Sequence, residues 1–67
     1  MRKEEIEQFL KNKGDFVKID HLSRFLKENL TMDIKKFVCL ELGELYEKTL
    51  MFSEAAKMYD VAALFSI

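Results

Sequence analysis

The segment CLELGELYEKTLMFSEAAKMYDVA, residues 39–62, decides the fold. Its first half repeats apolar side chains at the spacing of one helix face, and these are Leu42, Leu45 and Tyr46. Its second half places Ala55 and Ala62 seven residues apart, again on one helix face. The spacing predicts two helices, over about residues 33–48 and from about Ser53 onward. Small residues on the facing sides predict that these helices pack closely as a hairpin.

The same segment resembles the tetratricopeptide repeat, a 34-residue helical hairpin with the pattern W-x2-L-G-x2-Y, then A-x3-F and a closing proline. Six positions match in type and spacing: Leu42, Gly43, Tyr46, Ala55, Tyr59 and Ala62. We expect Gly43 to let the second helix lie directly against the first, and Tyr46 and Tyr59 to fill the space between repeats. The chain departs from the pattern at three positions: Cys39 replaces the bulky aromatic residue, Leu50 the turn glycine and Ile67 the proline.

Helical spacing also runs through the first half and predicts helices over about residues 2–13 and 19–29. Gly14 is suited to a left-handed cap that ends the first of them. The candidate N-caps of the later helices are Asp15 or Asp20, then Thr31 or Asp33, then Ser53. The predicted fold is therefore all-α, with four helices in two antiparallel hairpins that form a fragment of a tetratricopeptide-like superhelix.

The domain prediction is one tetratricopeptide-like unit over residues 1–67, with a well-matched hairpin at 33–67. Residues 2–30 resemble a degenerate repeat, with Gly14-Asp15-Phe16 in place of the family's Gly-Asp-Tyr turn. Ile19 and Leu26 stand where small residues are usual, so a plain helical hairpin is the alternative for this half.

Composition excludes several protein classes. The 67 residues (7.9 kDa) are 49% hydrophobic and 34% charged, with 11 basic and 12 acidic side chains and a net charge of −1. One cysteine and one histidine allow neither an internal disulfide nor a four-ligand zinc site. Because a chain without disulfides suits a reducing compartment, a cytoplasmic location is expected. Cys39 lies on an apolar helix face and is expected to be a small buried hydrophobe. No phosphate-binding loop, catalytic set or membrane-spanning stretch is found, so we expect no cofactor, no enzyme activity and no membrane insertion.

The resemblance also implies a peptide-binding face on the first helix of each hairpin. In the well-matched repeat the corresponding residues are Phe37, Leu40, Glu41, Glu44, Glu47 and Lys48. Some family members clamp a C-terminal carboxylate with Lys and Asn in this groove, but here those positions hold Leu40 and Glu44. The glutamates favour a basic or mixed protein or peptide partner. The alternative is an acidic helix face that only contacts solvent.

Repeat hairpins bury their faces by stacking, and about three are usually needed for stability. The apolar residues Leu64, Phe65 and Ile67 therefore predict either self-association into a homo-oligomer or continuation into a longer array. The predicted function is a protein–protein interaction scaffold. Two alternatives are a purely structural oligomerisation bundle and a small helix-turn-helix regulator that binds nucleic acid. The last would use a basic row at every third residue: Lys18, His21, Arg24 and Lys27. The low net charge makes nucleic acid the less favoured partner.

Overall fold

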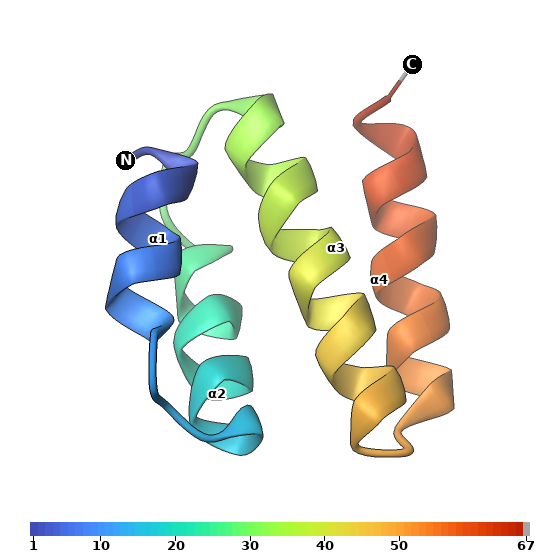
Figure 1. Ribbon diagram of the computed structural model, residues 1–67. Helices are drawn as coiled ribbons and strands as arrows, with labels where there is room; N and C mark the ends of the chain where they lie inside the picture. The colour runs from blue at the N-terminus through green and yellow to red at the C-terminus, as the bar shows by residue number, and fades with distance from the viewer. Residues whose placement is uncertain (67) are drawn as a thin grey trace.

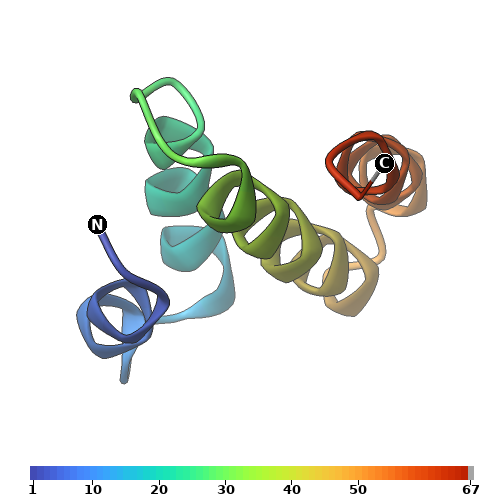
Figure 2. The ribbon, with the colours of Figure 1, turned by 90° about the horizontal axis from the view of Figure 1, so that it is seen from above.

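The computed structural model describes residues 1–66, which form four α-helices and contain no strand. The helices are α1 (Lys3–Leu10), α2 (Asp15–Phe25), α3 (Met32–Lys48) and α4 (Phe52–Leu64). They run alternately up and down, so the α1–α2 and α3–α4 turns lie at one end and both termini lie at the other (Figure 1). Seen from above, α1 and α2 lie on one side of α3 and α4 lies on the other (Figure 2). The all-helical prediction is confirmed.

The core forms around α3, the longest helix. One face of α3 buries four apolar side chains: Ile34, Val38, Leu42 and Leu45. They pack against Ile6 and Leu10 from α1 and against Leu22 from α2. Burying an aliphatic side chain of this size contributes about 1.5–3 kcal/mol, so this face supplies much of the stability of the fold.

A second face of α3 packs against α4. Cys39 and Gly43 are buried there, while Ala55 and Ala62 of α4 are each 2% exposed. The predicted close approach is present, because a Cβ atom on Gly43 would lie 2.6 Å from Cε1 of Tyr59. Tyr59 therefore fills space within this hairpin and not between the hairpins, which corrects the sequence expectation for that residue. Tyr46 does pack against the core that α3 shares with α1 and α2.

The α3–α4 turn contains a residue in the left-handed conformation that is not a glycine. Leu50 has φ 65°, the conformation that favours glycine at this point of a helix end. Its N–H donates to the carbonyl of Glu47 at 3.0 Å, and the N–H of Met51 donates to the carbonyl of Tyr46 at 2.7 Å. These two bonds form a Schellman motif, which satisfies carbonyl groups that the end of α3 would otherwise leave unpaired.

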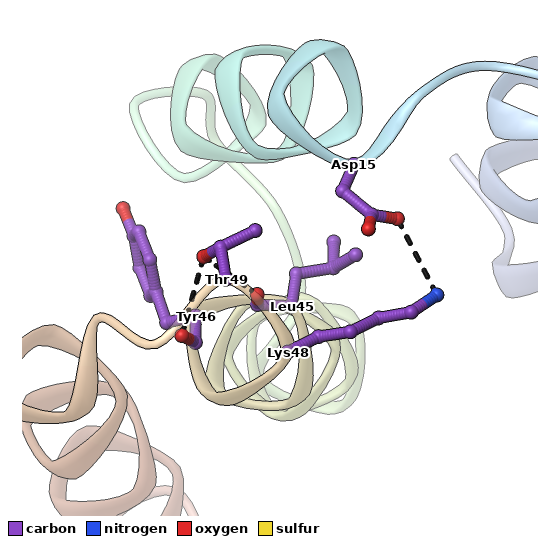
Figure 3. Close-up of polar contacts among 5 residues, drawn as sticks. All are labelled: Asp15, Leu45, Tyr46, Lys48 and Thr49. Carbon is purple, nitrogen blue, oxygen red and sulfur yellow. Dashed lines mark hydrogen bonds and ion pairs between the residues drawn. The ribbon is translucent and has the colours of Figure 1, made fainter.

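Side chains also close this helix end. The Thr49 hydroxyl donates to the carbonyls of Leu45 (3.0 Å) and Tyr46 (3.2 Å), as Figure 3 shows. Helix α4 then begins at Phe52, with Met51 as its N-cap. The prediction that Ser53 caps α4 is wrong, because the Schellman turn lets the chain re-enter a helix two residues earlier, with Met51 at the N-cap.

Helix boundaries in the first half differ from the prediction. The left-handed residue after α1 is Asn12 (φ 67°), whereas Gly14 has φ −71° and is the N-cap of α2. Asparagine tolerates this conformation better than most residues, so glycine is not required there. Helix α2 starts at Asp15, four residues before the predicted start, and the carboxylate lies in the first turn, where the helix dipole favours negative charge. Of the two candidate caps for α3, Thr31 and Asp33, the N-cap is Thr31, whose hydroxyl accepts from the N–H of Ile34 at 3.5 Å.

Candidate partner-binding groove

Two neighbouring hollows separate α1 from the exposed side of α3. The first has a volume of about 360 Å³ and is lined by Glu7, Gln8, Leu10, Lys11, Lys18, Glu41 and Leu45. The second, of about 350 Å³, is lined by Lys3, Asp33, Lys36, Phe37 and Leu40. Phe37 of the second hollow and Glu41 of the first are one turn apart on the same face of α3, and Lys3 and Glu7 are one turn apart on α1, so the two hollows follow one another along both helices. We call the two together the α1–α3 groove.

The second hollow has two apolar residues of α3 in its lining, Phe37 and Leu40. Phe37 is half-buried against the core, and Leu40 is 38% exposed. The Nζ atom of Lys3 lies 5.8 Å from the centre of the Phe37 ring, within the range of a cation–π contact. This hollow therefore offers two apolar side chains on α3, with Lys3, Lys36 and Asp33 as its charged lining.

The first hollow places carboxylates close together. Partial burial raises the pKa of Glu41, and the negative charges of Glu44 and Glu7 raise it further. Lys18 acts in the opposite direction and lowers this pKa by a smaller amount. Glu41 is therefore a carboxylate in a site that disfavours its charge, with lysines at the rim of the hollow.

Two of the six predicted groove residues have partners within the chain. The Tyr59 hydroxyl donates a hydrogen bond to Glu47, which links α4 to α3. The Nζ atom of Lys48 lies 3.4 Å from Oδ1 of Asp15, which links the end of α3 to the start of α2 (Figure 3). Neither side chain lines the α1–α3 groove. Phe37, Leu40 and Glu41 do line it, and the charge of Glu44 acts on Glu41.

Residues of α1 and α2 complete the groove, and the sequence prediction named none of them. Lys3 and Glu7 are one helical turn apart and flank Ile6, which is buried. This position at the border of the apolar stripe of α1 is the signal that could have identified them, once the stripe was known to face α3.

Two of the residues predicted for self-association, Leu64 and Phe65, lie at the C-terminal end of α4. Leu64 is 64% exposed and Phe65 is half-buried, while Ile67 lies outside the described residues. Helix α4 is buried only on its α3 side, and Ala56 and Ala63 are exposed on its outer side. The outer side of α4 is thus an uncovered surface with small side chains.

The four basic residues of α2 and its C-terminal extension do not act as one row. Arg24 pairs with Asp20 at 3.2 Å, and the His21 ring meets Phe9 edge-on at 4.7 Å between centroids. Lys18 lines the α1–α3 groove, and Lys27 follows the end of α2. This arrangement gives no support to the helix-turn-helix alternative, which needs a continuous basic surface on one helix.

The structure offers little for other kinds of chemistry. Cys39 is fully buried, as predicted, and burial raises the pKa of its thiol, which keeps it uncharged and unreactive. Within residues 1–66, no three His, Cys, Asp or Glu side chains are arranged to hold a metal ion. None of the four described helices combines the length and the apolar character required to cross a bilayer.

No protein-family model matches the chain, and searches of the curated proteins and of the solved structures return no significant match. The function is therefore inferred from the helices and their surfaces.

Proposed function

We propose that the chain is a protein–protein interaction module of the tetratricopeptide type, which binds a peptide segment in the α1–α3 groove. The observation that carries this proposal is the position of Glu41, partly buried beside Glu7 and Glu44 at a hollow open to solvent. A cation placed there would offset the cost of keeping three carboxylates close together, so binding a basic side chain is favourable.

The chemistry of the groove defines the ligand. A lysine or arginine would lie beside Glu41, and an apolar side chain would pack on Phe37 and Leu40 in the neighbouring hollow. The rim lysines, Lys11 and Lys18, disfavour a ligand that carries only positive charge. The preferred partner is therefore a mixed segment with one or two basic residues next to an apolar one.

Two features of the second hairpin support the tetratricopeptide type. Gly43 contacts the Tyr59 ring directly, which gives a physical reason for a small residue at this position of the pattern. Leu50 adopts the left-handed conformation at the position where the family has a glycine. Both features belong to the hairpin, and the stacking of further hairpins is a prediction of the proposal.

The proposal is tested by titrating the chain with a fluorescein-labelled nine-residue peptide that contains Leu-Lys-Lys and measuring anisotropy. An otherwise identical peptide with Leu-Glu-Glu is the ligand control. We expect Glu44→Lys to weaken binding of the Leu-Lys-Lys peptide about tenfold, equivalent to about 1.4 kcal/mol. Leu40→Ser should weaken it as well, since it removes one of the two apolar side chains of the second hollow.

Asp60→Lys is the matched control, because it makes the same charge change at an exposed position on α4, away from the groove. An equal loss of affinity in Glu44→Lys and Asp60→Lys would mean that the peptide responds only to net charge. That result, or equal binding of the two peptides, would contradict the proposed groove.

A further inference from the structure

Five exposed apolar side chains belong to the start of α2 and to the α3–α4 turn with the first residue of α4. Figure 1 shows that the start of α2 and the α3–α4 turn lie at the same end of the molecule. We call this set the turn-end patch, and its members are Phe16, Val17, Leu50, Met51 and Phe52. Phe16 is 68% exposed, Leu50 74% and Phe52 61%, so these side chains contribute little to the core. Together the five residues expose on the order of 500 Å², which is near the size of the largest apolar patch on a typical monomer, a patch that is often functional.

One ion pair connects the two segments that carry the patch. Nζ of Lys48 lies 3.4 Å from Oδ1 of Asp15, which links the end of α3 to the start of α2 (Figure 3). Phe16 follows Asp15 directly in the sequence, and Leu50 lies two residues after Lys48. The pair also neutralises two of the three charges in residues 12–17 and 48–53. The third charge, on Lys13, lies 4.6 Å from the centre of the Phe9 ring of α1.

We propose that the turn-end patch is a homodimer interface, covered by the same patch of a second copy of this chain. Two such patches, if buried completely, would cover about 1,000 Å² in total, which is typical of the smaller and weaker specific protein–protein interfaces. Because its charges are largely paired, the patch can face its own copy without strong like-charge repulsion. With a twofold axis through the interface, Phe16 and Leu50 of one copy would pack against the same two residues of the other copy.

The position of the patch argues against two other occupants. Further hairpins that continue the array would stack against the outer side of α4. They would therefore leave the turn end uncovered. Both termini lie at the opposite end, so a segment attached to either one would have to run back along the molecule, whose longest dimension is 28 Å (Figure 1). A second copy can reach the turn end directly, without stacking on α4 and without a connecting segment.

Sedimentation velocity over a concentration series from about 5 µM to 1 mM tests the proposal. The test variant is the double substitution Phe16→Glu with Leu50→Asn. Glu is favourable in the first turn of a helix and Asn tolerates φ near 65°, so the variant removes apolar surface while preserving the fold. We expect its dimer dissociation constant to be at least tenfold higher than that of the unmodified chain.

The control is Met32→Glu with Leu64→Asn, which makes the same chemical changes at exposed residues of the opposite end. It should leave the dissociation constant unchanged. A chain that is monomeric throughout the series would overturn the proposal, as would a dimer that only the Met32/Leu64 variant disrupts. The second result would instead assign self-association to the end formed by Leu64 and Phe65. Circular dichroism on each sample verifies folding, and peptide binding in the groove is measured separately, so the two proposals can fail independently.

Discussion

Gly43 lies directly beneath the ring of Tyr59, so close that a Cβ atom on the glycine would be 2.6 Å from Cε1 and 2.8 Å from Cζ of that ring. The ring position is reinforced at its far end, where the Tyr59 hydroxyl donates to Glu47 one helical turn along α3. The α3–α4 spacing is therefore set by a glycine on one helix and an aromatic side chain on the other.

Gly43→Ala should destabilise the chain despite the better helix propensity of alanine. Alanine in a helix interior is favoured over glycine by about 1 kcal/mol. The added methyl group must displace the Tyr59 ring, and overpacking of this kind costs about 1–3 kcal/mol. We expect a net loss of about 1 kcal/mol in the free energy of unfolding, measured by urea denaturation followed by circular dichroism.

A double-mutant cycle isolates this contact. In a Tyr59→Ala background the obstacle is absent, so Gly43→Ala should become neutral or stabilising through helix propensity alone. If Gly43→Ala costs the same free energy in both backgrounds, the close approach of Tyr59 is not what requires glycine at this position.

Leu50→Gly should stabilise the monomer. A left-handed conformation costs a non-glycine residue about 1–2 kcal/mol, and Leu50 gains little in return because it is 74% exposed. The greater entropy of glycine in the unfolded chain offsets part of the gain. We expect a rise in Tm of about 4 °C, equivalent to about 0.5 kcal/mol for a domain of this size.

The measurement is a thermal melt at low micromolar concentration, where self-association does not contribute. Leu50→Ala is the control, because it removes the same apolar surface and keeps the strained conformation. Similar melting temperatures for Leu50→Ala and Leu50→Gly would show that backbone conformation is not the source of any gain.

Tyr59 should ionise only in strongly alkaline solution. The hydrogen bond to Glu47, burial and the nearby negative charges raise the pKa of Tyr59 to about 12. This hydrogen bond is made by the protonated phenol, so its contribution to stability is complete below about pH 10 and is lost as the pH rises toward 12. Absorbance at about 295 nm in a Tyr46→Phe variant follows the ionisation of Tyr59 alone. Adding Glu47→Gln should lower that pKa, and an unchanged titration curve would count against the contact.

Glu41→Gln should stabilise the chain at neutral pH and not in acid. Burial and the charges of Glu44 and Glu7 raise the pKa of Glu41 in the folded state above its unfolded value. The ionised form is therefore disfavoured by folding, so the native carboxyl lowers stability at neutral pH, and this loss disappears as the pH falls through the folded pKa.

The expected gain at pH 7 is a fraction of about 1 kcal/mol, because Glu41 is only partly buried and solvent screens its interactions with the neighbouring carboxylates. Urea denaturation at pH 7 and at about pH 3.5 gives the comparison. Glu28→Gln, in the exposed α2–α3 connection, should show no such gain. A gain of equal size in both variants would point to net charge and not to the groove.

Local pattern was sufficient to predict the second hairpin. Helix α3 matches the predicted bounds to within one residue at its start, and its N-cap, Thr31, is one of the two candidates. The close approach at Gly43 also followed from the sequence, because the residues that determine it lie within one hairpin and repeat at helical spacing. The first half was predicted less well, since Asn12 and not Gly14 adopts the left-handed conformation that ends α1.

What the sequence by itself determined about this protein is its helical class and the packing of α3 on α4, both of which depend on spacing along a short stretch of chain. Only the tertiary structure decided which surfaces are open. It pairs Lys48 with Asp15, 33 residues away, brings Glu7 beside Glu41, and places Phe16 at the same end as Leu50. Helical periodicity defines the faces of each helix, but it carries no information about which face of a distant helix will lie opposite.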